Sequence, residues 1–208
     1  MIYSVKVPFL KVLFLIVALV LCVPPELSAD DEANRADPLE MEFDANVSSP
    51  AIPRKLRETV LGNVRSNVTH LRKQNFDVRT VRDGEVIVVT IPCESLFVAN
   101  STVLRPSASA LLKPFGAYLH QPQLYKVLVA AHSDNTGSEE YADELTEARA
   151  AAVDEFLTTM GGSQSLVVPY GMGMDDPLND NRTRVNRAKN RRVEIYLIPD
   201  APLFRKIR

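Results

Sequence analysis

Several residue types are scarce in this sequence, and each scarcity excludes a class of protein. The 208 residues include two cysteines, three histidines and no tryptophan. Two cysteines are too few for a disulfide-rich scaffold, and His70, His120 and His132 lack the spacing of a metal site. Basic and acidic residues nearly balance, 24 against 26, so there is no overall basic charge for nucleic acid. We expect no metal, no cofactor and no nucleic-acid partner.

Apolar residues make up 46% of the chain, which is enough for one sizeable core. The length favours one domain with appendages over two full domains. If the chain is exported, Cys93 has no disulfide partner once the leader is removed, and we expect its thiol to be shielded near a strand end.

Residues 1–29 are typical of an export signal peptide. Two lysines precede an uncharged apolar run, residues 12–23, which two prolines end. The run is shorter than the about 20 apolar residues of a membrane-spanning helix, so cleavage after Ala29 is favoured. A lipid on Cys22 and an uncleaved anchor are the alternatives. The predicted location is the periplasm, with contact to the outer membrane only through the signal or a lipid on Cys22.

Residues 30–53 are predicted to form an acidic flexible tether. Seven acidic residues in this stretch face only Arg35, and three prolines interrupt any regular element. We therefore expect no secondary structure before Arg54.

Residues 54–84 are predicted to form an amphipathic helix followed by a hairpin strand. Apolar residues recur at helical spacing from Arg54 to Gln74. Two β-rich runs, residues 76–81 and 85–91, then flank Arg82-Asp83-Gly84, and Asp-Gly between such runs is a strong hairpin signal. We expect the helix to pack on its own domain; the alternative is a surface for dimerisation.

Residues 85–199 read as alternating strands and helices, with residues 200–208 as a C-terminal tail. A helix is expected from Pro106 to about Leu119, with a kink at Pro114. Further elements are a buried strand at 125–131, a helix from the Thr136 and Glu139 capping box to Met160, a strand at 166–170, a polar loop or short helix at 171–190, and a strand at 193–198. The order β-α-β-α-β-β predicts an α+β fold with helices packed on one face of a mixed sheet.

The segment from His132 to Gly137 places polar groups where a buried strand ends and a helix begins, a natural ligand site. Asp134 and Asn135 lie in this corner, and Arg149 follows about three turns into the next helix. From spacing alone, a capping role for Asp134 and a solvated position for Arg149 are favoured.

Four motifs change that balance. Residues 131–137, 145–150, 171–173 with Pro177 and Asn181, and 190–195 resemble, in order and spacing, the OmpA-like C-terminal domain family. Pal lipoproteins and MotB stator proteins share that peptidoglycan-binding domain. The resemblance runs from about Glu85 to Ile198, includes the phenylalanine and polar loop of residues 97–104, and implies a β-α-β-α-β-β sandwich.

The resemblance implies a function as well. It implies noncovalent binding of the peptidoglycan stem peptide through diaminopimelate, without catalysis, so that the envelope is anchored to the wall. Asp134 would take the ammonium and Arg149 the carboxylate, which suits a zwitterion because it needs one anion and one bidentate cation. The residues expected around this pair are Asn135, Leu145, Thr146, Asn190 and Arg191.

Two positions depart from the family pattern. Ala131 stands where glycine is usual, and Ala142 stands where an asparagine ordinarily helps to hold the ligand. Loss of that amide should weaken binding by about 1 kcal/mol, or shift the contact to Asp143. Stem peptides repeat densely in a cell wall, and a tethered protein meets them at high effective concentration. Modest affinity at each site is therefore sufficient for anchoring. Ala142 also supports the alternative of a scaffold that has lost wall binding and pairs with itself or another envelope protein.

Two further interpretations are weaker. A wall hydrolase is the remote alternative, since His132, Ser133 and Asp134 are neighbours, but no Gly-x-Ser-x-Gly pattern appears. The basic stretch 182–192 lacks interleaved aromatic residues, so a solvated loop explains it better than a nucleic-acid patch.

Overall fold

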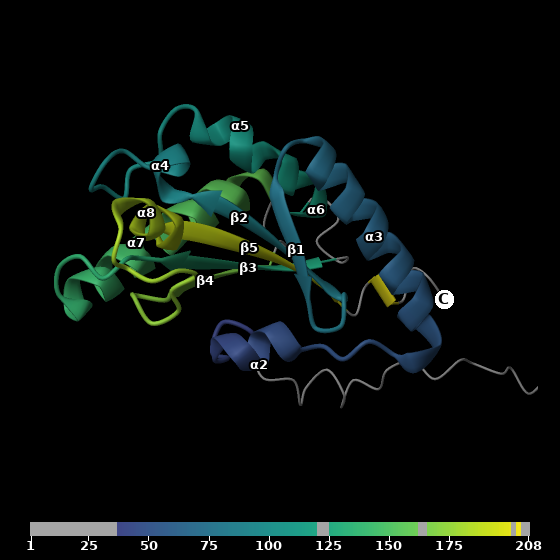
Figure 1. Ribbon diagram of the computed structural model, residues 1–208. Coiled ribbons are helices and arrows are strands. Elements are labelled where there is room, and N and C mark those ends of the chain that lie inside the picture. The colour runs from purple at the N-terminus through teal and green to yellow at the C-terminus, as the bar shows by residue number, and fades with distance from the viewer. Residues whose placement is uncertain (1–36, 120–124, 162–165, 201–202, 205–208) are drawn as a thin grey trace, which may run out of the picture. The chain divides into compact units, whose positions relative to one another are not determined.

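A single mixed β-sheet organises the computed structural model, which describes residues 37–119, 125–161, 166–200 and 203–204 (Figure 1). The strand order is β1-β2-β5-β3-β4. The β3 and β4 strands are parallel, and the other neighbours are antiparallel. The predicted α+β fold with a mixed sheet is therefore confirmed. The strands are β1 (Asp77–Val81), β2 (Val86–Pro92), β3 (Tyr125–His132), β4 (Val167–Gly171) and β5 (Arg192–Pro199).

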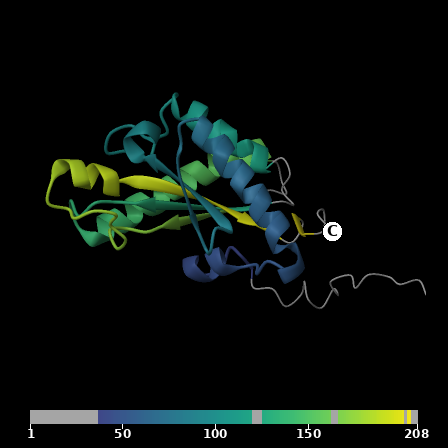
Figure 2. The same ribbon diagram turned by 45° about the vertical axis from the view of Figure 1, so that its right-hand side comes forward.

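The larger helices cover one face of this sheet, as expected (Figures 1 and 2). Their apolar side chains form the main core with alternate residues of the strands, such as Val127, Val129 and Ala131 of β3. The helices are α2 (Phe43–Ser48), α3 (Arg57–Lys73), α4 (Cys93–Leu96), α5 (Ala108–Leu112), α6 (Gly116–Leu119), α7 (Glu139–Gly161) and α8 (Arg184–Asn190), with the 3-10 helices η1 (Arg54–Leu56) and η2 (Lys113–Phe115).

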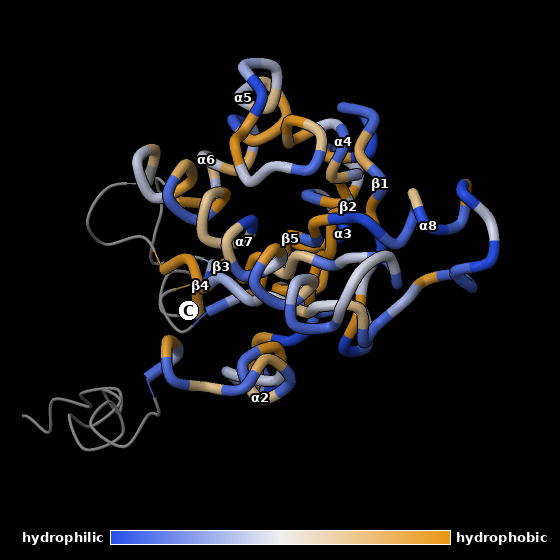
Figure 3. Tube along the Cα trace, turned by 90° about the vertical axis from the view of Figure 1, so that its left-hand side faces the viewer, coloured by the Kyte–Doolittle hydropathy of each residue, from blue (hydrophilic) through white to orange (hydrophobic). Residues whose placement is uncertain are grey.

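The hydropathy of the chain follows this layering. Figure 3 shows hydrophobic residues along the central strands and hydrophilic residues in α8 and the loop before it. Among the residues that the structure describes, none of the helices combines the length and the apolar character needed to cross a membrane.

Several local predictions are confirmed. The amphipathic helix packs on its own domain, because Val60, Val64, Val68 and Leu71 are buried in the main core. The hairpin turns at residues 82–84, all of which have positive φ angles. A 3-10 turn at Pro114 interrupts the following helix.

The predicted capping box of α7 is wrong, because the capping residue is Ser138, two residues after the predicted Thr136. The Ser138 hydroxyl accepts a hydrogen bond from the Tyr141 backbone N–H at 3.2 Å, and the Ala142 N–H donates to the Ser138 carbonyl at 3.1 Å. Ser138 therefore caps the helix. Thr136 lies in the turn before it. The described part of α7 runs to Gly161, and the rest of the Gly161-Gly162 pair that was predicted to end the helix lies outside the described residues.

The second face of the sheet is covered by residues that were predicted to be a flexible tether. Phe43 and Val47 of α2 pack against the apolar side chains of this face. The Phe43 ring meets the rings of Tyr170 and Tyr196 edge-on, each at 5.2 Å between centroids. Aromatic packing of this kind fixes the segment on the sheet.

Polar contacts hold the same segment. The buried Lys126 ammonium donates to the backbone carbonyls of Asn46 and Ser49, both at 2.7 Å, and Arg82 donates to the carbonyl of Pro50 at 2.8 Å. The tether prediction is therefore wrong for residues 37–53. It fails because Lys126, Arg82 and the Tyr170 hydroxyl donate hydrogen bonds to backbone carbonyls of this segment. Residues 30–36 lie outside the described residues.

Asn46 offers a direct test of this packing. Its side chain is fully buried, donates to the Tyr170 hydroxyl and the Pro38 carbonyl at 2.6 Å each, and accepts from Lys126. We expect Asn46→Ala to lower the free energy of unfolding by about 2 kcal/mol, because the buried Lys126 and the half-buried Tyr170 and Pro38 each lose a hydrogen bond. Urea denaturation measures this, with exposed Asn63→Ala as the matched control. Equal stability of the two variants would show that the segment is not packed.

Candidate functional site

A cavity of about 420 Å³ opens where β3 ends and β5 begins. In Figure 1 the elements around it, α4, α8 and the beginning of α7, lie at the same end of the sheet. Its walls come from α4 and the loop after it, the corner between β3 and α7, one face of α7, and the segment that enters β5. The lining residues are Cys93, Glu94, Phe97, Val98, Ala99, Asn100, Arg105, Ser133, Asp134, Thr136, Tyr141, Leu145, Arg149, Arg184 and Arg191.

The antiparallel register of β3 and β5 brings Asp134 and Arg191 together. His132, the last residue of β3, pairs with Arg192, the first of β5, so the residues just beyond this pair meet at the sheet end. Arg191 Nη1 forms an ion pair with Asp134 Oδ2, and the Thr136 backbone N–H donates to Asp134 Oδ1 at 2.9 Å. Burial alone would raise the pKa of Asp134, but these hydrogen bonds from Thr136 and Arg191 hold it below its usual range. Asp134 is therefore a carboxylate at neutral pH.

Arg149 reaches the cavity from α7. Tyr141, Leu145 and Arg149 are spaced four residues apart, so they share one face of the helix, and that face lines the cavity. The Arg149 guanidinium lies over the Phe97 ring at 5.2 Å, and its Nε donates to the Ser101 carbonyl at 3.1 Å. These contacts fix the orientation of the guanidinium plane before any ligand arrives.

Gly171 sets the position of α7 against the sheet. A Cβ atom at Gly171 would lie 2.6 Å from the backbone nitrogen of Glu147, a distance that no side chain tolerates. The glycine therefore permits β4 to approach the middle of α7 closely. Leu145 and Arg149 flank this contact, so the close approach fixes both at the cavity wall.

The predicted site residues divide into two groups. Asp134, Leu145, Arg149 and Arg191 all line the cavity. Asn135, Thr146 and Asn190 are not among its walls.

Thr146 and Asn190 are fully buried and hold the loop between β4 and α8. The Thr146 hydroxyl accepts from the Gly173 N–H at 3.0 Å, and the Asn190 amide oxygen accepts from the Asn179 N–H at 2.9 Å. Asn135 is exposed in the turn. The structure therefore gives Thr146 and Asn190 structural contacts in place of the expected position at the pocket.

Several wall residues escaped the sequence analysis. Tyr141 could have been found, because it precedes Leu145 by one helical turn. The sequence analysis matched Phe97 and its loop to the family, but only tertiary packing shows that Phe97 lines the cavity and that Ser101 of the same loop accepts a hydrogen bond from Arg149.

The departure at Ala142 is not compensated at the cavity. Ala142 is buried. The Asp143 carboxylate lies instead against Gly173, where an added Cβ would come within 2.1 Å of its Oδ1. Asp143 is not among the lining residues, so the structure gives no support to the expectation that it takes over the role of the missing asparagine.

Cys93 also lines the cavity, shielded as expected. Only 4% of its surface is exposed, at the start of α4 beside the end of β2. Burial raises the pKa of its thiol to about 11, although Arg149 and Arg191 oppose this effect. The thiol is therefore protonated and unreactive at neutral pH.

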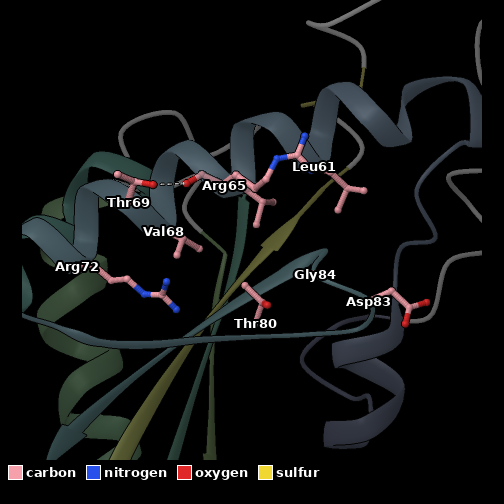
Figure 4. A pocket seen from close by; sticks show the side chains of 9 residues that line it. Leu61, Arg65, Val68, Thr69, Arg72, Thr80, Asp83 and Gly84 are labelled. Atoms are coloured by element: carbon pink, nitrogen blue, oxygen red, sulfur yellow. Dashed lines mark hydrogen bonds between the residues drawn. The ribbon is translucent and has the colours of Figure 1, made fainter.

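A second hollow, of about 450 Å³, lies between α3 and β1 and includes Leu61, Arg65 and Thr80 (Figure 4). Arg72 also lines it, and its guanidinium donates to the Val78 carbonyl of β1 at 2.8 Å. None of the predicted site residues lines this hollow.

His132 faces away from the cavity. Its position in β3 places it on the second face of the sheet with Glu194, and neither ring nitrogen has a hydrogen-bond partner in the described part of the chain. Burial, with a smaller contribution from Arg192, lowers the pKa of His132 to about 4. His132 is therefore not placed to act as a base for Ser133.

The sheet therefore carries its larger helices on one face and a charged cavity at one end. The OmpA family model matches residues 96–191. The outer-membrane lipoprotein YfiB of Pseudomonas aeruginosa is 32% identical over 127 residues, which cover 61% of this chain and 73% of YfiB. The chain belongs to the OmpA family.

Two further relatives extend the comparison. The peptidoglycan-binding protein ArfA of Mycobacterium tuberculosis is 39% identical over 72 residues, or 35% of this chain and 22% of ArfA. The solved structure of the cell wall anchor of the T6SS from Pseudomonas aeruginosa is 28% identical, with a TM-score of 0.55 over 67% of this chain and 97% of that one. The chain spans little more than half, 56% and 57%, of the length of two other curated relatives.

The environment of His132 predicts acid sensitivity. A neutral buried histidine stabilises the fold above the unfolded pKa of about 6.5, and this stability is lost as the pH falls toward about 4. Between pH 7.5 and 5 we expect the free energy of unfolding to fall by about 2 kcal/mol. Denaturant melts of His132→Gln should lose this dependence, whereas the exposed His70→Gln should keep it. An unchanged pH profile in His132→Gln would contradict the account.

Proposed function

We propose that the chain binds peptidoglycan noncovalently and that the cavity receives the free end of a diaminopimelate side chain. The observation that carries the proposal is the presence of Asp134 and Arg149 on the walls of one cavity. A diaminopimelate side chain in a stem peptide ends in an ammonium and a carboxylate on one carbon. Such a zwitterion needs an anion and a cation that are held a few ångströms apart.

The remaining hydrogen-bonding capacity of the two residues suits this ligand. Each Asp134 oxygen accepts one hydrogen bond within the protein, from Thr136 and from Arg191, and a carboxylate oxygen can accept a second. The Arg149 Nε is committed to Ser101, which leaves the two terminal amino groups to meet a carboxylate. We assign the ammonium to Asp134 and the carboxylate to Arg149.

Anchoring of the cell envelope to the wall follows from such binding. Stem peptides repeat densely in a wall, so a tethered domain meets many sites at high effective concentration. Modest affinity at each site is then sufficient. The names of ArfA, a peptidoglycan-binding protein, and of the T6SS cell wall anchor support this role for the family relatives.

Catalysis is not part of the proposal. Hydrolysis by Ser133 would need a base within hydrogen-bond reach, and His132 lies on the other face of the sheet. The alternative is a domain of the same fold that has lost its affinity for the cell wall through Ala142. Cosedimentation with sacculi distinguishes the two.

Cosedimentation with purified sacculi tests the assigned pair. We expect Asp134→Asn and Arg149→Ala to bind at least tenfold more weakly than the wild type, because each removes one charge of a matched pair in a largely buried site. Asp134→Asn keeps the acceptor for Thr136 but loses the ion pair with Arg191, so loss of binding reports the missing negative charge together with that pair.

The matched controls are the exposed Glu155→Gln and Arg182→Gln, which lie off the cavity and should pellet like the wild type. Thermal melts of each variant confirm that it is folded. If both cavity variants pellet as well as the controls, the assigned site is wrong. If the wild type itself fails to pellet, the scaffold interpretation holds.

Soluble stem peptides test the ligand. A peptide with diaminopimelate at its third position should bind at least tenfold more tightly than the same peptide with lysine there, because lysine supplies the ammonium but no carboxylate for Arg149. Isothermal titration calorimetry measures both dissociation constants. Equal affinity for the two peptides would contradict the role of Arg149.

A further inference from the structure

The cavity carries more positive charge than a single zwitterion uses. Four arginines line it, Arg105, Arg149, Arg184 and Arg191, against the two carboxylates of Glu94 and Asp134. Under the proposed function, the ammonium and carboxylate of one diaminopimelate side chain cancel. Such a ligand would leave the surplus of positive charge in the cavity uncompensated.

Three of these arginines already have partners. Arg191 forms the ion pair with Asp134, Arg149 donates to the Ser101 carbonyl, and Arg105 Nε donates to the Phe97 carbonyl at 2.6 Å. Each of these contacts holds an arginine of the cavity wall in place.

Arg184 differs from the other three. It is exposed in the first turn of α8, and its guanidinium has no hydrogen bond or ion pair to any residue that the structure describes. Its backbone is nevertheless fixed, because the Thr183 hydroxyl accepts from the Asn186 N–H at 3.1 Å and caps the helix. Arg184 thus presents an uncommitted guanidinium at the cavity from a fixed position.

We propose that Arg184 is a specificity-determining residue that binds a second carboxylate of the stem peptide. The inference rests on the proposed function and deepens it. A guanidinium recognises a carboxylate through paired N–H donors, whereas a carboxamide carries no charge and offers one acceptor oxygen. The site would therefore favour stem peptides whose other carboxylates are free and discriminate against amidated ones.

Two carboxylates of a stem peptide qualify, the α-carboxylate of the glutamate at its second position and the carboxylate at its C-terminus. The experiment uses three diaminopimelate peptides: one with both carboxylates free, one amidated at the glutamate, and one amidated at the C-terminus. Binding of the wild-type protein to each is measured by isothermal titration calorimetry at low ionic strength.

We expect one amidation to weaken binding by about three- to tenfold, which is typical of a charge-assisted contact at a partly exposed position. The position of that amidation identifies the carboxylate. Arg184→Gln should bind the free peptide as weakly as the wild type binds the amidated one, and the same amidation should then have no effect. Arg184→Lys should recover part of the preference because it restores the charge.

Arg182→Gln is the matched control. Arg182 is also an exposed arginine, two residues away and outside the cavity wall, so the variant should keep the wild-type preference. If Arg184→Gln keeps the wild-type ratio between free and amidated peptides, or if neither amidation weakens wild-type binding, the inference is overturned while the proposed function stands. If the wild type binds none of the three peptides, the proposed function fails, and the inference falls with it.

Discussion

The cavity depends on the antiparallel pairing of β3 with β5. Because His132 pairs with Arg192, the two chain segments just beyond the sheet meet, and Arg191 can neutralise the buried Asp134 although 57 residues separate them. Arg192 fixes the start of β5 through ion pairs with Asp176 at 3.1 Å and Glu194 at 3.0 Å. A buried carboxylate without a partner would be protonated or expelled, so this register is a condition for the site.

The remaining parts of the site are arranged around that corner. Close packing of α7 on Gly171 directs one helical face, with Leu145 and Arg149, to the cavity, while Phe97 covers the guanidinium from the other side. Both charges are thereby fixed in position and largely removed from water before a ligand binds. A pre-oriented pair loses little conformational entropy on binding, which suits the proposed binding of a repeated, zwitterionic group.

Local patterns predicted most of the fold, whereas the resemblance to the OmpA-like C-terminal domain family predicted the central pair of the site. The alternation of strands and helices, the Asp-Gly hairpin and the interruption at Pro114 are each determined by the residues of one short segment, so the sequence of that segment is enough to predict them. Thr146 shows where such reasoning stops. It adjoins Leu145 in sequence, but one residue turns the helix by about 100°, which directs its hydroxyl to Gly173 and away from the cavity.

The packing of residues 37–53 was missed for a related reason. Their acidic, proline-rich composition describes the segment alone, whereas its order comes from partners far along the chain, Lys126, Arg82 and Tyr170. The positions of Phe97 and Arg184 on the cavity wall likewise result from tertiary structure. Composition cannot reveal a partner that lies 80 residues away.

The central claim is that one carboxylate and one guanidinium of this cavity hold a zwitterion. A crystal structure of the domain with a diaminopimelate stem peptide tests it most directly. The account predicts the ligand ammonium about 3 Å from the Asp134 carboxylate and the ligand carboxylate on the terminal amino groups of Arg149. A peptide bound instead in the hollow between α3 and β1, or bound in the cavity with its zwitterion turned away from Asp134 and Arg149, would contradict it.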